Sequence, residues 1–238
     1  MKKYLAIGLC LVSMGGWAET TFKNWKALGY KSANDQMHLY EIGTIEWELM
    51  AEKIGESKYI EKLKNCINKN PFCSAILGKY YYEHKNYSRA YQLLSTYYVD
   101  LNKYSFDPYR GNVEFELGAM FDNGFGVLQN EDKAIAHYKI CASVGNKSCA
   151  YNISIIYGHR ISESNDYKIQ TSNIIKSYAW RQVSRALGQE KAYLKAGGTE
   201  NISVALDMKV EDANKLNLRP QANKLASQIC STIPKCIQ

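Results

Sequence analysis

The sequence predicts an all-α protein built from repeated pairs of antiparallel helices. Three observations carry this prediction. Apolar residues recur three and four positions apart along most of the chain, glycine residues stop that pattern, and neighbouring segments repeat the spacing found in residues 117–145. One helix pair cannot bury both of its apolar faces alone. We therefore expect about four hairpins that stack on one another.

The clearest helix pair lies between Leu117 and Gly145. Its first helix is expected to end at Gly124 and Gly126, because glycine favours turns over a continuing helix. Asn130 and the two acidic residues after it suit the start of a second helix, where side-chain oxygens accept bonds from unpaired amides. Gly145 is expected to close that helix.

The residues of this pair, LG..F..G.GV....DKA..HY..CA..G, closely resemble the Sel-one-like repeat, a relative of the tetratricopeptide repeat. Within that family, the chain resembles the exported, cysteine-rich type. The resemblance implies an α-solenoid of stacked helix pairs that usually works as a protein-binding scaffold and usually lacks catalysis.

Three other segments are expected to form helices. Residues 35–67 predict a degenerate first hairpin in which Ser57 caps a helix over 59–67, after an irregular cap at 19–34. Residues 73–97 are expected to form a second hairpin with a short turn at Asn86. Residues 102–111 are expected to form a loop that leads into the helix pair at 117–145, here called the central pair. The tail from Val204 predicts two short helices, of which the second starts near Pro220.

The segment after the central pair carries an apparent insertion. Twenty-four residues separate Ile153 from Ser177, where 17 separate Leu117 from Ala134. The seven extra residues fall in the polar stretch 158–173, which predicts a long turn. Such a loop would serve in binding or would be a tolerated insertion without a role.

The chain begins with the pattern of a secretory leader. Lys2 and Lys3 precede an apolar run that ends in small residues, and cleavage is expected after Ala18, which leaves residues 19–238 as one repeat domain. The net charge of +7 is mild and its basic residues are scattered. The sequence therefore favours neither nucleic acid binding nor stable membrane insertion.

The cysteines are a second indication of the compartment in which the protein resides. After removal of the leader, six cysteines remain in three close pairs, and an even count in an exported chain predicts disulfides. Six cysteines allow 15 pairings. The local pairing is favoured because Gly145 turns the chain between two of them, and because Cys73 and Cys149 hold equivalent places in their repeats. The pairs are Cys66 with Cys73, Cys141 with Cys149, and Cys230 with Cys236.

No catalytic motif is found in the sequence, and no cofactor or metal site is predicted. The chain has no nucleophile elbow, phosphate-binding loop or zinc motif, and its four histidines lie far apart. Asp122 with Glu131 or Asp132 would form an acid pair beside a turn, but carboxylates at helix ends usually serve as caps.

Tyrosine is unusually abundant, at 19 residues. Three consecutive tyrosines at 80–82 cannot all face one core, and exposed tyrosine is common in binding surfaces. In related repeats the first helix of each pair lines the concave face. The resemblance therefore implies a set of partner-binding residues, the alternative being that they only fill contacts between repeats. The set is Lys79, Tyr82, Glu83, Phe115, Asp122, Tyr151, Ile155 and His159.

The main functional expectation is a non-enzymatic periplasmic scaffold whose partner is another protein. Its most concrete form is an inhibitor or immunity protein that neutralises a secreted toxin such as a lipase or wall hydrolase. A housekeeping scaffold for a cell-envelope enzyme is the first alternative. The second is β-lactam binding or hydrolysis, which lacks a Ser-x-x-Lys arrangement here because Ser57 and Ser88 have no lysine three residues later.

Overall fold

A computed structural model describes residues 55–68, 71–98, 107, 109–188, 217–233 and 236. The described residues form eight α-helices and no strand, so the all-α prediction is confirmed. The chain divides into two compact units, residues 1–129 and 130–238, and each is described by itself. The predicted leader, the segment 19–54, most of the loop 102–111 and the tail helix from Val204 lie outside the described residues.

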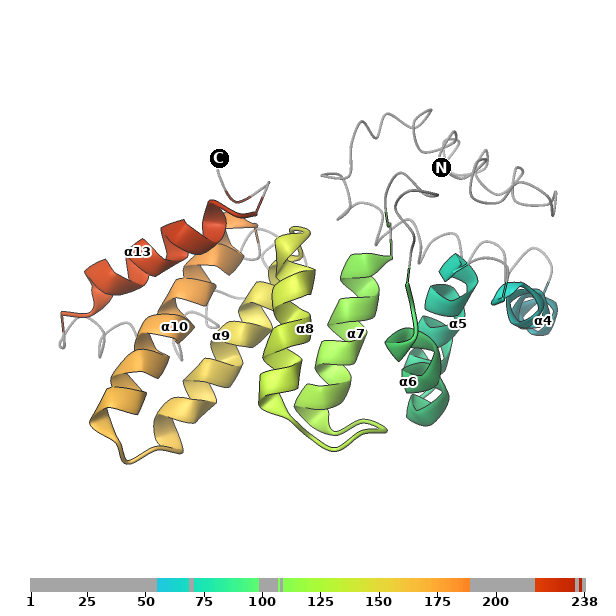
Figure 1. Ribbon diagram of the computed structural model, residues 1–238, viewed down its shortest axis with the longest axis horizontal. Coiled ribbons are helices and arrows are strands. Elements are labelled where there is room, and N and C mark those ends of the chain that lie inside the picture. Colours follow the sequence, from blue (N-terminus) through green and yellow to red (C-terminus); the bar gives the residue numbers. More distant parts are fainter. Residues whose placement is uncertain are drawn as a thin grey trace. The chain divides into compact units, whose positions relative to one another are not determined.

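The first unit contains α4 (Glu56–Cys66), α5 (Pro71–Glu83), α6 (Tyr87–Ser95) and α7 (Arg110–Asn123), all labelled in Figure 1. Each helix packs on the next in chain order, and α5 also contacts α7. This contact between the first helices of successive pairs is the packing of an α-solenoid.

Close packing of α5 on α6 depends on Gly78. A Cβ atom at this position would lie 2.6 Å from Cδ2 of Leu94, so the absence of a side chain lets the two helices meet. Leu94 belongs to a core cluster with Val113, Leu117 and Met120 of α7. The spacing of apolar residues in the sequence therefore places one continuous core beneath the three helices.

Two predicted boundaries in this unit are wrong. Ser57 does not cap a helix, because α4 already begins at Glu56 and Gly55 is its N-cap residue, without a side-chain bond. The loop predicted to reach Gly111 ends earlier, since α7 begins at Arg110. There Asp107 accepts hydrogen bonds from the Tyr97 hydroxyl at 2.5 Å and the Tyr109 amide at 3.1 Å, and these bonds order the entry into α7.

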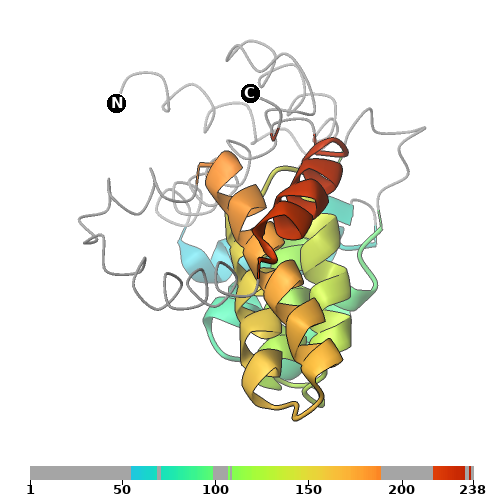
Figure 2. The same cartoon turned by 90° about the vertical axis from the view of Figure 1, so that its left-hand side faces the viewer.

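The second unit contains α8 (Glu131–Ser143), α9 (Lys147–Ser162), α10 (Tyr167–Ala186) and α13 (Arg219–Cys230). Asparagine or aspartate side chains accept amide hydrogen bonds at the starts of three of these helices, at Asn130, Asn146 and Asp166. Helices α9 and α10 form an antiparallel pair, and Figures 1 and 2 show α13 lying obliquely across α10.

The predicted long turn at 158–173 is wrong. Helix α9 continues to Ser162 and α10 begins at Tyr167, so only residues 163–166 are non-helical. The seven extra residues lengthen both helices instead. Polar side chains of α10 join the two helices by donating to carbonyl oxygens of α9, and the first of the three bonds lies within the extension. Asn173 bonds the Arg160 oxygen at 3.2 Å, Ser177 the Ser154 oxygen at 2.7 Å, and Ser184 the Lys147 oxygen at 3.0 Å.

In the helix pair that contains Leu117 to Gly145, the end of α7 and both ends of α8 match the sequence prediction. Gly124 follows α7 in the left-handed conformation, with φ of 72°, and Asn130 caps α8 by accepting from the Lys133 amide at 2.9 Å. Gly145 has φ of 91° after α8. Glycine and asparagine stand where the backbone requires them.

The three local disulfides are confirmed. Cys66 is bonded to Cys73, Cys141 to Cys149, and Cys230 to Cys236, with Cα atoms 4.9–6.0 Å apart. The first joins the end of α4 to α5, and the second joins the end of α8 to α9. Three disulfides indicate an oxidising, extracytoplasmic compartment. Within the helices that the structure describes, none combines the length and apolar character needed to cross a membrane.

Replacing Cys141 and Cys149 together by alanine is expected to lower the free energy of unfolding by about 2–3 kcal/mol, since the closed loop is short. The two sulfur-bearing side chains are fully buried, so packing adds to the loss. Urea denaturation of the variant and the oxidised wild type measures the difference. The matched control is Cys230→Ala/Cys236→Ala near the chain end. A larger loss in that control would contradict the account.

Candidate functional site

The predicted partner-binding residues divide between the two units. Lys79, Tyr82 and Glu83 lie on one face of α5, and Phe115 and Asp122 lie on α7 of the same unit. Glu83 is exposed, while the other four are partly exposed. The structure therefore offers a surface of mixed charge and aromatic character along α5.

Ionisable groups of α5 and α7 meet at this face. Lys79 pairs with Glu83 one helical turn away, and its Nζ atom lies 3.9 Å from Oε1 of Glu116 on α7. Glu116 is 3% exposed, and among the described residues no group hydrogen-bonds its Oε2 atom. Glu116 was not among the predicted site residues, because nothing in its sequence position marks its carboxyl as buried.

Burial controls the charge state of Glu116. Removal from water raises the pKa of its carboxyl to about 8, with the Lys79 ammonium opposing the shift and the Glu83 carboxylate adding to it. At neutral pH the group is therefore mainly protonated. Lys79 then makes its ion pair with Glu83, whose side chain is 43% exposed, and the pair stays at the surface.

An aromatic cluster lies beside these charges. The ring of Tyr82 packs edge-on against Tyr87 at 5.7 Å, and Tyr87 stacks on Phe125 at 4.6 Å with an interplanar angle of 8°. All three rings are partly exposed. Gly126 permits this stack, because its backbone lies directly against the backbone of Tyr87. Partly exposed rings held by their neighbours offer contact area at little entropic cost.

The tyrosines at 80–82 do not share one core, and each contacts a different partner. The Tyr80 hydroxyl donates to Glu56 of α4 at 2.8 Å, the Tyr81 hydroxyl accepts from Arg89 of α6 at 3.3 Å, and Tyr82 meets Tyr87. All three are half-buried. This run therefore links α5 to both of its neighbours while leaving part of each ring open to solvent.

The remaining predicted residues lie on α9 of the second unit. Tyr151 and Ile155 are half-buried and His159 is exposed. The Arg181 guanidinium of α10 lies over the Tyr151 ring, 4.6 Å from its centroid. A cation–π contact of this kind fixes the ring in place. Tyr151 thus contributes to helix packing as well as to the surface.

The acidic residues at the start of α8 contact a basic residue that sequence reasoning missed. Arg160 of α9 bonds Oε2 of Glu131 at 2.5 Å and Oδ1 of Asp132 at 2.9 Å, and its guanidinium lies 5.8 Å from the Tyr157 ring centroid. Glu131 and Asp132 occupy the first turn, as predicted, but Asn130 is the cap. The two carboxylates therefore join α8 to α9.

Replacing Arg160 by methionine is expected to cost about 1 kcal/mol of unfolding free energy, because charge-assisted bonds are strong but this group is partly exposed. Its side chain is 24% exposed. Glu131→Gln should cost more than Asp132→Asn, since Asp132 is 86% exposed and Glu131 only 26%. Urea denaturation of the three variants checks this order, and the reverse order would contradict the assignment.

Among the residues that the structure describes, no three His, Cys, Asp or Glu side chains gather so that they could hold a metal ion. The six cysteines discussed above are in disulfides, so they present no thiolate.

Comparison of the chain with models of known protein families, with curated proteins and with solved structures finds no match. Function is therefore inferred from the geometry of the described residues.

Proposed function

We propose that this chain is a non-enzymatic scaffold of the periplasm that binds another protein, and that it belongs among the Sel-one-like repeats. The observation that carries the proposal is the α5 face, where partly exposed Tyr82 lies on the same face as the Lys79–Glu83 ion pair. Tyrosine beside charged groups is the composition of protein-binding surfaces, and helices fixed by packing and disulfides hold such groups ready for contact.

The most concrete form of the proposal is an inhibitor or immunity protein. Its partner would be a toxin that acts outside the cytoplasm, such as a lipase or wall hydrolase. The disulfides support the compartment, since they need an oxidising environment. A leader at residues 1–18, removed during export, would bring the chain there.

The first test is capture of a partner with residues 19–238 from a periplasmic extract, followed by a high-salt wash and mass spectrometry. A single stoichiometric hydrolase whose activity falls when the purified chain is added supports the inhibitor form. A stoichiometric envelope enzyme that keeps its activity would point to a housekeeping scaffold. No partner, or covalent labelling of the chain by a β-lactam probe, would overturn the proposal.

A further inference from the structure

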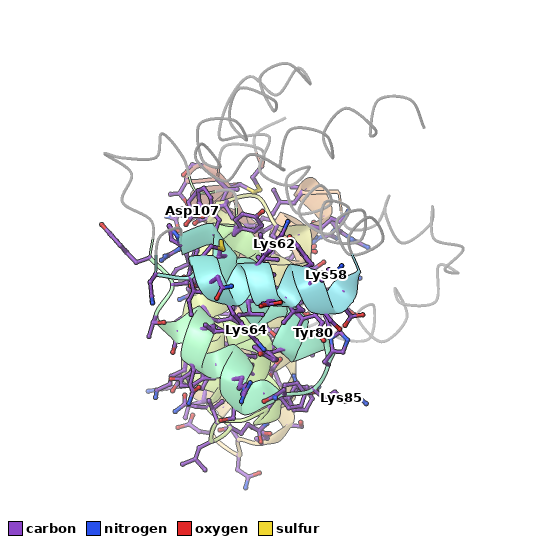
Figure 3. The ribbon with its side chains drawn as sticks, turned by 90° about the vertical axis from the view of Figure 1, so that its right-hand side faces the viewer. Lys58, Lys62, Lys64, Tyr80, Lys85 and Asp107 are labelled. Atoms are coloured by element: carbon purple, nitrogen blue, oxygen red, sulfur yellow. A yellow bond between two sulfur atoms is a disulfide. The ribbon has the colours of Figure 1, made fainter. Side chains whose placement is uncertain are left out.

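We propose that the outer side of α4 docks an acidic patch of the protein partner. The residues concerned, here named the α4 basic face, are Lys58, Lys62 and Lys64 of α4 and Lys85 in the turn after α5. Figure 3 looks onto α4 and shows the three α4 lysines along the helix, with Lys85 beyond Tyr80. This inference rests on the proposed protein-binding function and names the chemistry of the partner.

The positive charges of this face are only partly explained by helix stability, because Glu61 lies three residues from both Lys58 and Lys64 but no carboxylate lies at such a spacing from Lys62. Lys64 lies in the last turn of α4, where a cation suits the helix dipole, but Lys58 lies in the first turn, where it does not. Lys58 and Lys62 are four residues apart, a spacing at which like charges repel. Within the described part of the chain, none of the four lysines makes an ion pair.

The acidic residues of α4 offset these charges only in part. Glu56 accepts the hydrogen bond of the Tyr80 hydroxyl at 2.8 Å and lies 3.8 Å from Nε2 of His84, so its carboxylate faces α5. Glu61 is the other carboxylate of the helix and is exposed. Helix α4 has three lysines against these two carboxylates, and Glu56 faces α5, so its outer side keeps an excess of positive charge that fits an acidic partner surface.

Helix α4 is also held in place at both ends. Its last residue, Cys66, is bonded to Cys73 near the start of α5, and Glu56 in its first turn is bonded to Tyr80 near the end of α5. Between these ends, Tyr59, Ile60 and Leu63 pack in a core cluster with Cys73 and Leu77. The lysines therefore project from a fixed helix, which reduces the ordering that a partner must impose on binding.

The test measures binding of a fluorescent polyglutamate peptide at low ionic strength to three forms of the full chain. Lys58→Glu/Lys62→Glu is the test variant, and it should fold because a glutamate in the first turn suits the helix dipole. Lys139→Glu/Lys168→Glu, at exposed positions of α8 and α10, makes the same change in net charge and is the matched control. Circular dichroism checks that each variant remains helical.

We expect about tenfold weaker binding for the α4 variant, from the loss of several exposed charge interactions, and little change for the control. Equal losses in the two variants, or no loss in the α4 variant, would overturn the inference. Binding to phosphatidylglycerol vesicles without binding to polyglutamate would overturn it in favour of a membrane surface. The partner-capture experiment tests the scaffold proposal separately. A negative result for the α4 basic face would therefore leave the scaffold proposal in place.

Discussion

We expect the wild-type protein to lose stability as the pH rises from about 5 to about 8. The substitution Glu116→Gln is expected to abolish this loss. The folded-state pKa of Glu116 is about 8, against an ordinary value of 4.5, because the carboxyl is buried. Between these values the unfolded chain has released the proton and the folded chain still holds it. The free energy of unfolding therefore falls by about 1.4 kcal/mol for each pH unit in this window.

Below the window both states are protonated, and above it both are ionised, so the contribution of Glu116 is constant on either side. A neutral amide has no such dependence. The measurement is urea denaturation of both proteins across the window, with exposed Glu61→Gln as the control. If Glu116→Gln followed the wild-type pH profile, the buried protonated state would be wrong.

The second large effect is expected at the turn after α7. Gly126→Ala should lower the free energy of unfolding by about 2–4 kcal/mol, since a left-handed residue with a side chain is strained and the added atom overpacks the site. Gly126 has φ of 70°, and a Cβ atom there would lie 2.8 Å from the carbonyl carbon of Tyr87. Backbone atoms cannot move aside as a flexible side chain does.

Gly124 provides the matched control for this substitution. Its φ of 72° is nearly the same, but its added Cβ atom would meet its nearest neighbour, the Gln129 side chain, at an ordinary 3.5 Å. Gly124→Ala should therefore cost only the backbone strain, about 1–2 kcal/mol. Denaturation midpoints of the two variants separate strain from collision. Equal losses would show that the contact with Tyr87 has no energetic weight.

Sequence periodicity and turn residues predicted the helix pairs, because glycine and asparagine have specific backbone roles that show in the sequence. Gly124, Asn130 and Gly145 stand where they were expected. The disulfides followed from the short distances between cysteines in the chain. These features are local, so a single sequence contains enough information to place them.

The lengths of α9 and α10 were not predictable in the same way. Residues 158–173 are polar and resemble a loop, yet they extend both helices. Within this stretch a stabilising bond joins the Asn173 side chain to the Arg160 oxygen, across two helices. A pattern of apolar residues carries no signal for such bonds, because buried polar side chains look like surface residues in the sequence.

The residues of the candidate site show the same difference between those that the sequence predicts and those that depend on the fold. Lys79 and Glu83 were predicted together because the family resemblance implies that the first helix of each pair lines the concave face. Glu116 was missed because its burial depends on the packing of α5 on α7. Arg160 was missed since its partners, Glu131 and Asp132, lie 29 and 28 residues away in the chain. Contacts between residues that lie far apart in the chain can be identified only once the fold is known.

The most direct test of the scaffold proposal compares two tyrosines against a purified partner. Tyr82→Ser removes a ring from the α5 face, whereas Tyr98→Ser removes one that is 71% exposed beyond α6. Isothermal titration of the captured partner should show a loss of about tenfold or more in affinity for Tyr82→Ser and unchanged affinity for Tyr98→Ser. Wild-type affinity in the Tyr82→Ser variant, with its fold intact, would contradict binding through this face.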